Sequence, residues 1–123
     1  MFEGIAERVN ADPAIVRWGR HMNETFMVQV GEAQYLVTVA AGRVEKVERG
    51  PFVMRPWRFA VRASAEAWGR LWQPTPEPGW HDLSALAKRG YARLEGDLHP
   101  LMANLQYVKD LLALPRRIAG GRS

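Results

Sequence analysis

TFMVQVGEAQYLVTVAAGRVEKVER, residues 25–49, contains three segments in which apolar and polar side chains alternate. A period of two residues is typical of a strand that buries one of its faces. The turn sequences GEAQ and AAGR separate the segments, so the stretch predicts three consecutive antiparallel strands. Val44 and Val47 in the third segment are out of step by one residue, which predicts a bulge or a solvated edge strand.

Helical patterns lie on both sides of these strands. Residues 2–20 predict two short helices, because Asp12 followed by Pro13 is a cap and a helix start. RFAVRA (58–63) predicts a fourth strand, and Ser64 is placed to cap the helix that follows it. Asp82 is placed to cap another helix, and YARLEG (91–96) predicts a short last strand.

The last helix is predicted to begin at Asp97 as its cap and to run without a break. Its apolar residues form one stripe at helical spacing: Leu98, Leu101, Met102, Leu105, Val108 and Leu112. The order of elements predicts an α+β fold with a single sheet and helices packed on one face. We expect one domain over residues 1–114 and a basic, flexible tail over residues 115–123.

Composition excludes several classes of protein. The chain contains 123 residues and no cysteine, which excludes a disulfide scaffold, a thiolate metal site and a cysteine nucleophile. No apolar run approaches the roughly 20 residues of a spanning helix, and no secretory signal is recognised, so a cytoplasmic protein is expected. The net charge of +4 is spread over both halves of the chain and does not indicate nucleic-acid binding.

Four pieces in this order resemble the sterol carrier protein type 2 (non-specific lipid-transfer) family. They are the hairpins of residues 25–50 and the segments FAVRASAEAWGRLW, ALAKRGYARLEGD and LEGDLHPLMANLQYVKDLL. The stretch that carries the resemblance runs from about Thr25 to Leu114. The resemblance implies a five-stranded sheet covered by helices, with an apolar tunnel between them and no catalytic motif. It implies binding of a fatty acid, an acyl-CoA ester or a sterol, without a cofactor. The connector with Phe52, Met54 and Trp57, the loop QPTPEPGW and the C-terminus GGRS depart from the family pattern.

Large apolar side chains gather in the middle third of the chain and in the last helix, as expected for a lipid pocket. The predicted pocket residues are Phe26, Phe52, Met54, Trp57, Phe59, Trp68, Leu71, Trp72, Trp80, Leu86, Leu101, Met102, Leu105, Val108 and Leu112. The alternative is that these residues form an ordinary core. Arg55 and Arg58 are candidates for pairing with a lipid carboxylate or a CoA phosphate at the mouth of this pocket. A quinone-like lipid is a further candidate ligand.

Other functions remain open at this point. A small hydratase or isomerase could use His81 and Asp82 as an acid–base pair. A non-catalytic accessory module could present an apolar surface to an enzyme of a lipid or quinone pathway. No pair of histidines has the spacing of zinc ligands, so no metal site is predicted. A homodimer and a weak contact between the basic tail and an anionic membrane are further predictions.

Overall fold

Five strands form a single mixed sheet with the order β3-β2-β1-β4-β5 in this computed structural model, which describes residues 4–52, 54–73, 80 and 82–114. The strands are β1 (Thr25–Val30), β2 (Ala33–Ala40), β3 (Arg43–Arg49), β4 (Phe59–Ala63) and β5 (Ala92–Gly96). β1 and β4 are parallel, and the other neighbouring strands are antiparallel. The predicted α+β class with one mostly antiparallel sheet is confirmed.

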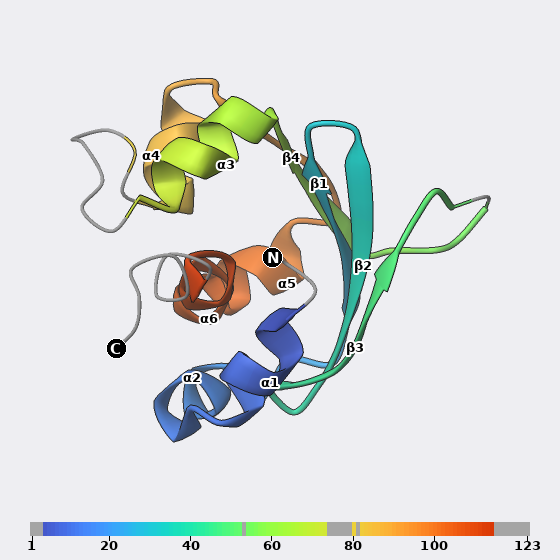
Figure 1. The fold of residues 1–123 in the computed structure, drawn as a ribbon. Coiled ribbons are helices and arrows are strands. Elements are labelled where there is room, and N and C mark those ends of the chain that lie inside the picture. The colour runs from blue at the N-terminus through green and yellow to red at the C-terminus, as the bar shows by residue number, and fades with distance from the viewer. Residues whose placement is uncertain (1–3, 53, 74–79, 81, 115–123) are drawn as a thin grey trace.

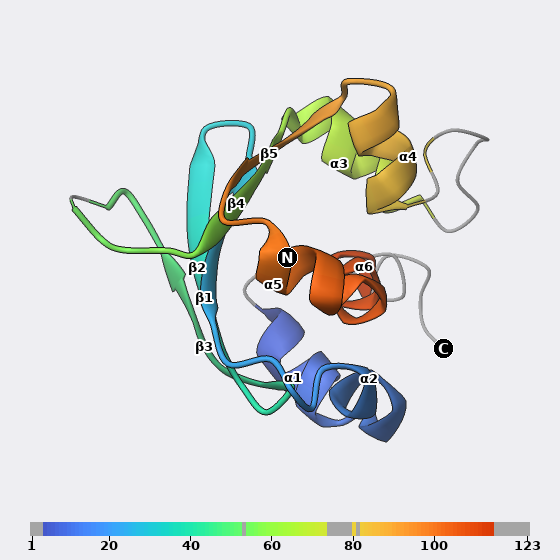
Figure 2. The same cartoon turned by 180° about the vertical axis from the view of Figure 1, so that it is seen from behind.

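All the described helices lie on one face of this sheet, here called the inner face (Figures 1 and 2). They are α1 (Ile5–Asn10), α2 (Pro13–Trp18), α3 (Ala65–Leu71), α4 (Leu83–Lys88), α5 (His99–Ala103) and α6 (Leu105–Leu112). None of these described helices has the length and hydropathy of a membrane-spanning segment. The segment between β3 and β4 crosses on the opposite side, the outer face (Figure 1).

The predicted bulge lies in β3, at the edge of the sheet. Lys46 is opposite Thr38 and Val44 is opposite Val39, so Glu45 between them has no paired residue in β2. The bulge keeps Val44 buried although it breaks the alternation of the strand. The predicted caps are also confirmed: the side chains of Asp12, Ser64 and Asp82 each accept a backbone N–H from the first turn of their helix.

The predicted continuous last helix is wrong, because the structure divides it at Asn104 into α5 and α6. Asn104 has φ −125° and ψ 35°, and its side-chain amide donates to the carbonyl of Pro100 at 2.9 Å. A side chain that bonds to a nearby carbonyl competes with the regular helical ladder. Asp97 also lies one residue before the position of the cap, although its carboxylate accepts the N–H of His99 at 3.1 Å.

Tyr107 of α6 joins the last helix to the first hairpin. Its buried hydroxyl donates to the carbonyl of Gly42 in the turn between β2 and β3, at 2.8 Å. Its ring lies against Gly19, at the end of α2, so closely that a Cβ on Gly19 would lie 2.5 Å from the ring. Three segments that are distant in sequence therefore meet at one side chain.

We expect Tyr107→Phe to lower the free energy of unfolding by about 1–2 kcal/mol, because the carbonyl of Gly42 loses its donor inside the protein. Tyr91→Phe is the matched control at an exposed tyrosine and should change stability by less than about 0.5 kcal/mol. Urea denaturation of the two variants measures the difference. Equal stability of Tyr107→Phe and the wild type would contradict this role.

Burial raises the pKa of the Tyr107 phenol well above its ordinary value. The phenol therefore stays neutral in the folded protein at a pH where it ionises in the unfolded chain. Its contribution to stability is complete below a pH of about 10 and is lost progressively as the pH rises above it. We expect wild-type stability to fall more steeply with alkaline pH than that of Tyr107→Phe, and denaturation at a series of pH values measures this.

Candidate functional site

Most of the predicted pocket residues lie together between the inner face of the sheet and the helices. The fully buried ones are Phe26, Phe59, Trp68, Leu71, Leu86, Leu101, Val108 and Leu112, and the half-buried Trp72, Trp80 and Leu105 pack against them. The rings of Phe26 and Phe59 stack with their centroids 4.8 Å apart. None of the described buried residues is polar or charged apart from the tyrosines, so this cluster suits an apolar ligand and no ionic group.

Four predicted pocket residues lie elsewhere, which corrects their expected place beside the others. Phe52 and Trp57 pack on the outer face against Met27, Leu36 and Ala60, because the connector between β3 and β4 crosses that face. Met54 is 96% exposed on this connector. Met102 is 55% exposed, since the break at Asn104 separates its turn from the apolar stripe of α6.

A seam between α3 and α4 on one side and α6 on the other crosses the inner cluster. The indole N–H of Trp72, the residue that follows α3, donates to the carbonyl of Leu112 in α6 at 2.8 Å. The ammonium group of Lys109 in α6 lies 3.1 Å from the carboxylate of Asp82, which caps α4. We call the region of these two contacts the α3–α4/α6 seam. It is held by polar contacts as well as by apolar packing.

Trp80 lies beside the beginning of α4, and its ring stacks on Tyr91 with the centroids 4.4 Å apart. The guanidinium of Arg70 lies 4.9 Å from the centroid of the Trp80 ring, and that of Arg89 lies 6.0 Å from it. Aromatic rings and cations in this arrangement attract one another. These contacts hold Trp80 beside α3 and α4 on the helical side of the sheet.

Of the predicted acid–base pair, Asp82 is described by the structure, whereas His81 lies outside the described residues. The carboxylate of Asp82 accepts the N–H of Ala85 at 2.9 Å and pairs with Lys109, so Asp82 acts as a helix cap and as an ion-pair partner. Among the described residues, no group of acids and histidines is arranged to hold a metal ion. The tail with Arg116, Arg117 and Arg122 also lies outside the described residues.

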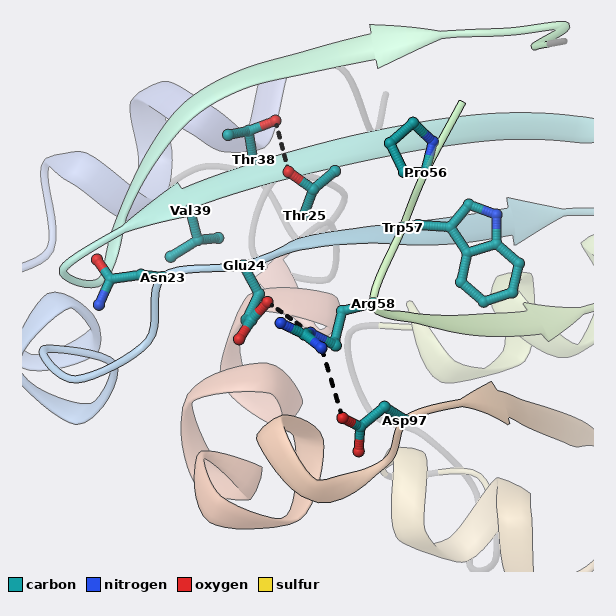
Figure 3. A pocket seen from close by; sticks show the side chains of 9 residues that line it. All are labelled: Asn23, Glu24, Thr25, Thr38, Val39, Pro56, Trp57, Arg58 and Asp97. Atoms are coloured by element: carbon teal, nitrogen blue, oxygen red, sulfur yellow. Dashed lines mark hydrogen bonds and ion pairs between the residues drawn. The ribbon is translucent and has the colours of Figure 1, made fainter. Parts of the chain in front are cut away.

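A groove of about 630 Å³, lined by both polar and apolar side chains, opens where the ends of several strands meet (Figure 3). Its lining residues are Asn23, Glu24, Thr25, Thr38, Val39, Pro56, Trp57, Arg58 and Asp97. Trp57 is the only predicted pocket residue in this lining, so the groove is distinct from the expected tunnel. The tunnel itself stays a prediction.

Arg58 lies at the centre of this groove between two carboxylates. Its Nε is 2.9 Å from Glu24, and its Nη1 is 3.7 Å from Asp97. The hydrogen bond to Glu24 raises the pKa of Arg58 above its ordinary value. Arg58 also donates its backbone N–H to Thr25 and accepts the N–H of Asp97, so the backbone fixes the residue on both sides.

The two arginines predicted to contact a head group are thus already paired within the chain. Arg55 makes two hydrogen bonds to the carboxylate of Glu48, at 3.1 and 2.9 Å, and these lower the pKa of Glu48. The sequence did not predict that the groove residues other than Trp57 and Arg58 would lie together, because they come from separate segments. The alternation of the strands could have placed Thr25 and Thr38 on the same face of the sheet.

The placement of the last-helix residues is testable with two neighbours on α5. Leu101→Ala should lower the free energy of unfolding by about 2–5 kcal/mol, because it leaves a cavity in the inner cluster. Met102→Ala, at an exposed position, should change it by less than about 0.5 kcal/mol. Thermal or urea denaturation compares them, and a large loss for Met102→Ala would contradict this placement.

Comparison of the whole chain gives similarity in structure and none in sequence. No protein-family model and no curated protein matches the chain. It is similar to a crystal structure of sterol carrier protein 2, with a TM-score of 0.76, 13% identity, and coverage of 94% of this chain and 92% of that one. A conserved hypothetical protein of Thermus thermophilus, described as possibly a sterol carrier protein, gives a TM-score of 0.72 at 14% identity. The match covers 99% of this chain and 88% of that one.

A third similar structure is the ubiquinone synthesis protein UbiJ-SCP2. Its TM-score is 0.55 at 18% identity, with coverage of 93% of this chain and 89% of that one. Identities at this level show the fold and nothing finer. The fold that the sequence resemblance implies is confirmed: this chain has the sterol carrier protein 2 fold.

Proposed function

We propose that this protein binds a lipid, with its apolar tail between the inner face of the sheet and the α3–α4/α6 seam. The ligand classes are a fatty acid, an acyl-CoA ester or a sterol-like molecule. The observation that carries the proposal is the likeness to sterol carrier protein 2 over 94% of the chain. The proposal is one of binding and carriage rather than of catalysis.

The chemistry of the inner cluster supports an apolar ligand. Its side chains are aromatic and aliphatic, and each methylene of a ligand buried among them contributes at most about 0.8 kcal/mol. Such a site selects by length and shape. Because the buried cluster offers no charge among the described residues, the head group must remain at the surface.

The seam is the place where a ligand would be admitted in this proposal. Trp72 is half-buried there, and parting α6 from α3 breaks the hydrogen bond between Trp72 and Leu112. Lys109 is the positively charged residue of this seam, and the carboxylate of a ligand can replace Asp82 as its partner. Lys109 thus takes the head-group role in this proposal in place of Arg55 and Arg58, which lie toward the outer face.

A second candidate function is an accessory module of a quinone or lipid pathway. It is supported by the likeness to UbiJ-SCP2, which is described as a ubiquinone synthesis protein. A quinone-like tail is as apolar as an acyl chain, so the two functions share the inner cluster as the binding site. They differ in whether the ligand is carried or presented to a partner enzyme. A homodimer remains a prediction under either function.

Native mass spectrometry of the freshly purified protein, followed by organic extraction, tests the proposal. We expect a bound mass that is released into the extract as a fatty acid, acyl-CoA or sterol-like lipid, or uptake of such a lipid from a mixed extract. A released quinone with a stable protein partner would favour the accessory function. An unliganded mass with no uptake from mixed lipids would contradict lipid binding.

The role of the seam is tested by Lys109→Met, which removes the ion pair with Asp82. We expect faster uptake of a fluorescent fatty acid in stopped-flow experiments and weaker retention of its carboxylate. Lys46→Met is the matched control, because Lys46 pairs with Glu48 at 3.5 Å on β3, away from the seam. Equal uptake kinetics for the two variants would contradict admission through the seam.

A further inference from the structure

The free sides of the two border strands of the sheet, β3 and β5, differ. In β3, the side-chain amide of Asn10 donates to the carbonyl of Val44 and accepts the N–H of Val44, both at 2.9 Å. Asn10 and the bulge at Glu45 therefore prevent another strand from pairing along β3. β5, at the opposite border (Figure 2), has β4 as its one neighbour among the described strands and contains no bulge, proline or lysine.

The hydrogen bonds of the sheet fix which backbone groups of β5 face its free side. The carbonyl of Ala63 accepts the N–H of Gly31, the residue that follows β1, at 3.0 Å, so the backbone of Ala63 faces β1. Because successive residues of a strand direct their N–H and C=O groups to opposite sides, Arg62 faces β5, and Arg93 opposite it faces β4. Leu94, the next residue, directs its N–H and C=O to the free side. Such an edge is a template for a further strand.

The side chains of β5 form a pattern that is complementary to itself. Arg93 and Glu95 lie on the outer face, on either side of Leu94, whose half-buried side chain packs against the inner cluster. When two copies of β5 pair in antiparallel register about Leu94, each Arg93 lies opposite a Glu95 and the two leucines meet. A register centred on Arg93 would instead place two arginines opposite each other, which is destabilising.

Arg93 can change its partner without the loss of an ion pair. Within the chain, one carboxylate oxygen of Glu95 lies 2.8 Å from Arg62, and the other lies 3.4 Å from Arg93. The side chain of Arg93 is 76% exposed, so it can turn from its own Glu95 to the partner's Glu95. The pair of Glu95 with Arg62 then remains. The ion pairs select the register, whereas backbone hydrogen bonds and the contact between leucines stabilise the association.

We propose that two copies of this chain associate through β5, in antiparallel register about Leu94, so that their sheets join. The inference goes beyond lipid binding and does not depend on it. A second copy fits this edge better than a strand of another protein, because the charges of β5 complement those of an identical strand. Two strands of five residues bury less area than a stable complex needs, so the dimer should form at high protein concentration.

Sedimentation velocity over a series of concentrations up to about 1 mM, which covers weak association, tests the proposal. The wild type should change from monomer to dimer within the series. Arg93→Glu should raise the dissociation constant of the dimer about tenfold or more, because the new acid would lie opposite the partner's Glu95 twice in each dimer. A wild type that stays monomeric throughout would overturn the proposal, whether the edge stays free or takes a strand of another protein.

Arg43→Glu is the matched control, because it makes the same change of charge at an exposed arginine of the other border strand, β3. It should leave the dissociation constant unchanged. An equal effect of Arg43→Glu and Arg93→Glu would overturn association through β5.

A mixture of two charge variants tests the register. Arg93→Glu has acids at both positions and Glu95→Lys has bases at both, so neither variant complements itself. Equal amounts of the two should form a mixed dimer with a dissociation constant close to that of the wild type. Failure of the mixture to dimerise, while both variants keep the wild-type circular dichroism spectrum, would overturn the proposed register.

Hydrogen exchange of the wild type adds a measurement that needs no substitution. The N–H of Leu94 should exchange more slowly at concentrations where the dimer forms, because it then donates to the partner strand. The N–H of Val44, which already donates to Asn10 at the other border, is the reference and should not change. Equal exchange of Leu94 at low and high concentration would overturn the proposal.

Discussion

The hydrogen bond from Tyr107 to the carbonyl of Gly42 sets the position of the last helix, on which the closure of the interior depends. A buried hydrogen bond of this kind is costly to break, because the carbonyl cannot find water as a substitute. The same ring fills the space beside Gly19 at the end of α2. α6 is therefore fixed at one border to the N-terminal helices and the first hairpin.

The other border of α6 is the α3–α4/α6 seam, where Trp72 and Lys109 make its contacts. The difference between the two borders gives the proposed function a physical basis. In the proposed function the seam would part while the contacts of Tyr107 stay in place. The break at Asn104 ends α5 and precedes α6, so the two helices are not one continuous rod.

The two faces of the sheet differ in chemistry. The inner face buries aromatic and aliphatic side chains, whereas the outer face carries ion pairs such as that of Arg62 with Glu95 at 2.8 Å. Hydrogen bonds from Arg62 lower the pKa of Glu95, so the carboxylate stays charged beside the apolar cluster of Trp57. A lipid tail bound as proposed would contact the inner face of the sheet and not the ion pairs of the outer face.

Local patterns in the sequence were sufficient for the strands and for the caps at Asp12, Ser64 and Asp82, because alternation and capping depend on neighbours along the chain. They were not sufficient for Met54 and Met102. Both are apolar residues with apolar neighbours in the sequence. Their exposure to solvent follows from the path of the connector and from the break at Asn104. The groove around Arg58 depends on segments that meet only in the folded chain.

The most direct measurement is a proton–nitrogen NMR titration of the five tryptophan indoles with a fatty acid. Lipid binding in the inner cluster predicts that the indole signals of Trp68 and Trp72 shift. Trp18 on α2 and Trp57 on the outer face are internal references whose signals should stay in place. Shifts confined to Trp18 or Trp57, or no shift at saturating fatty acid, would contradict binding between the sheet and the helices.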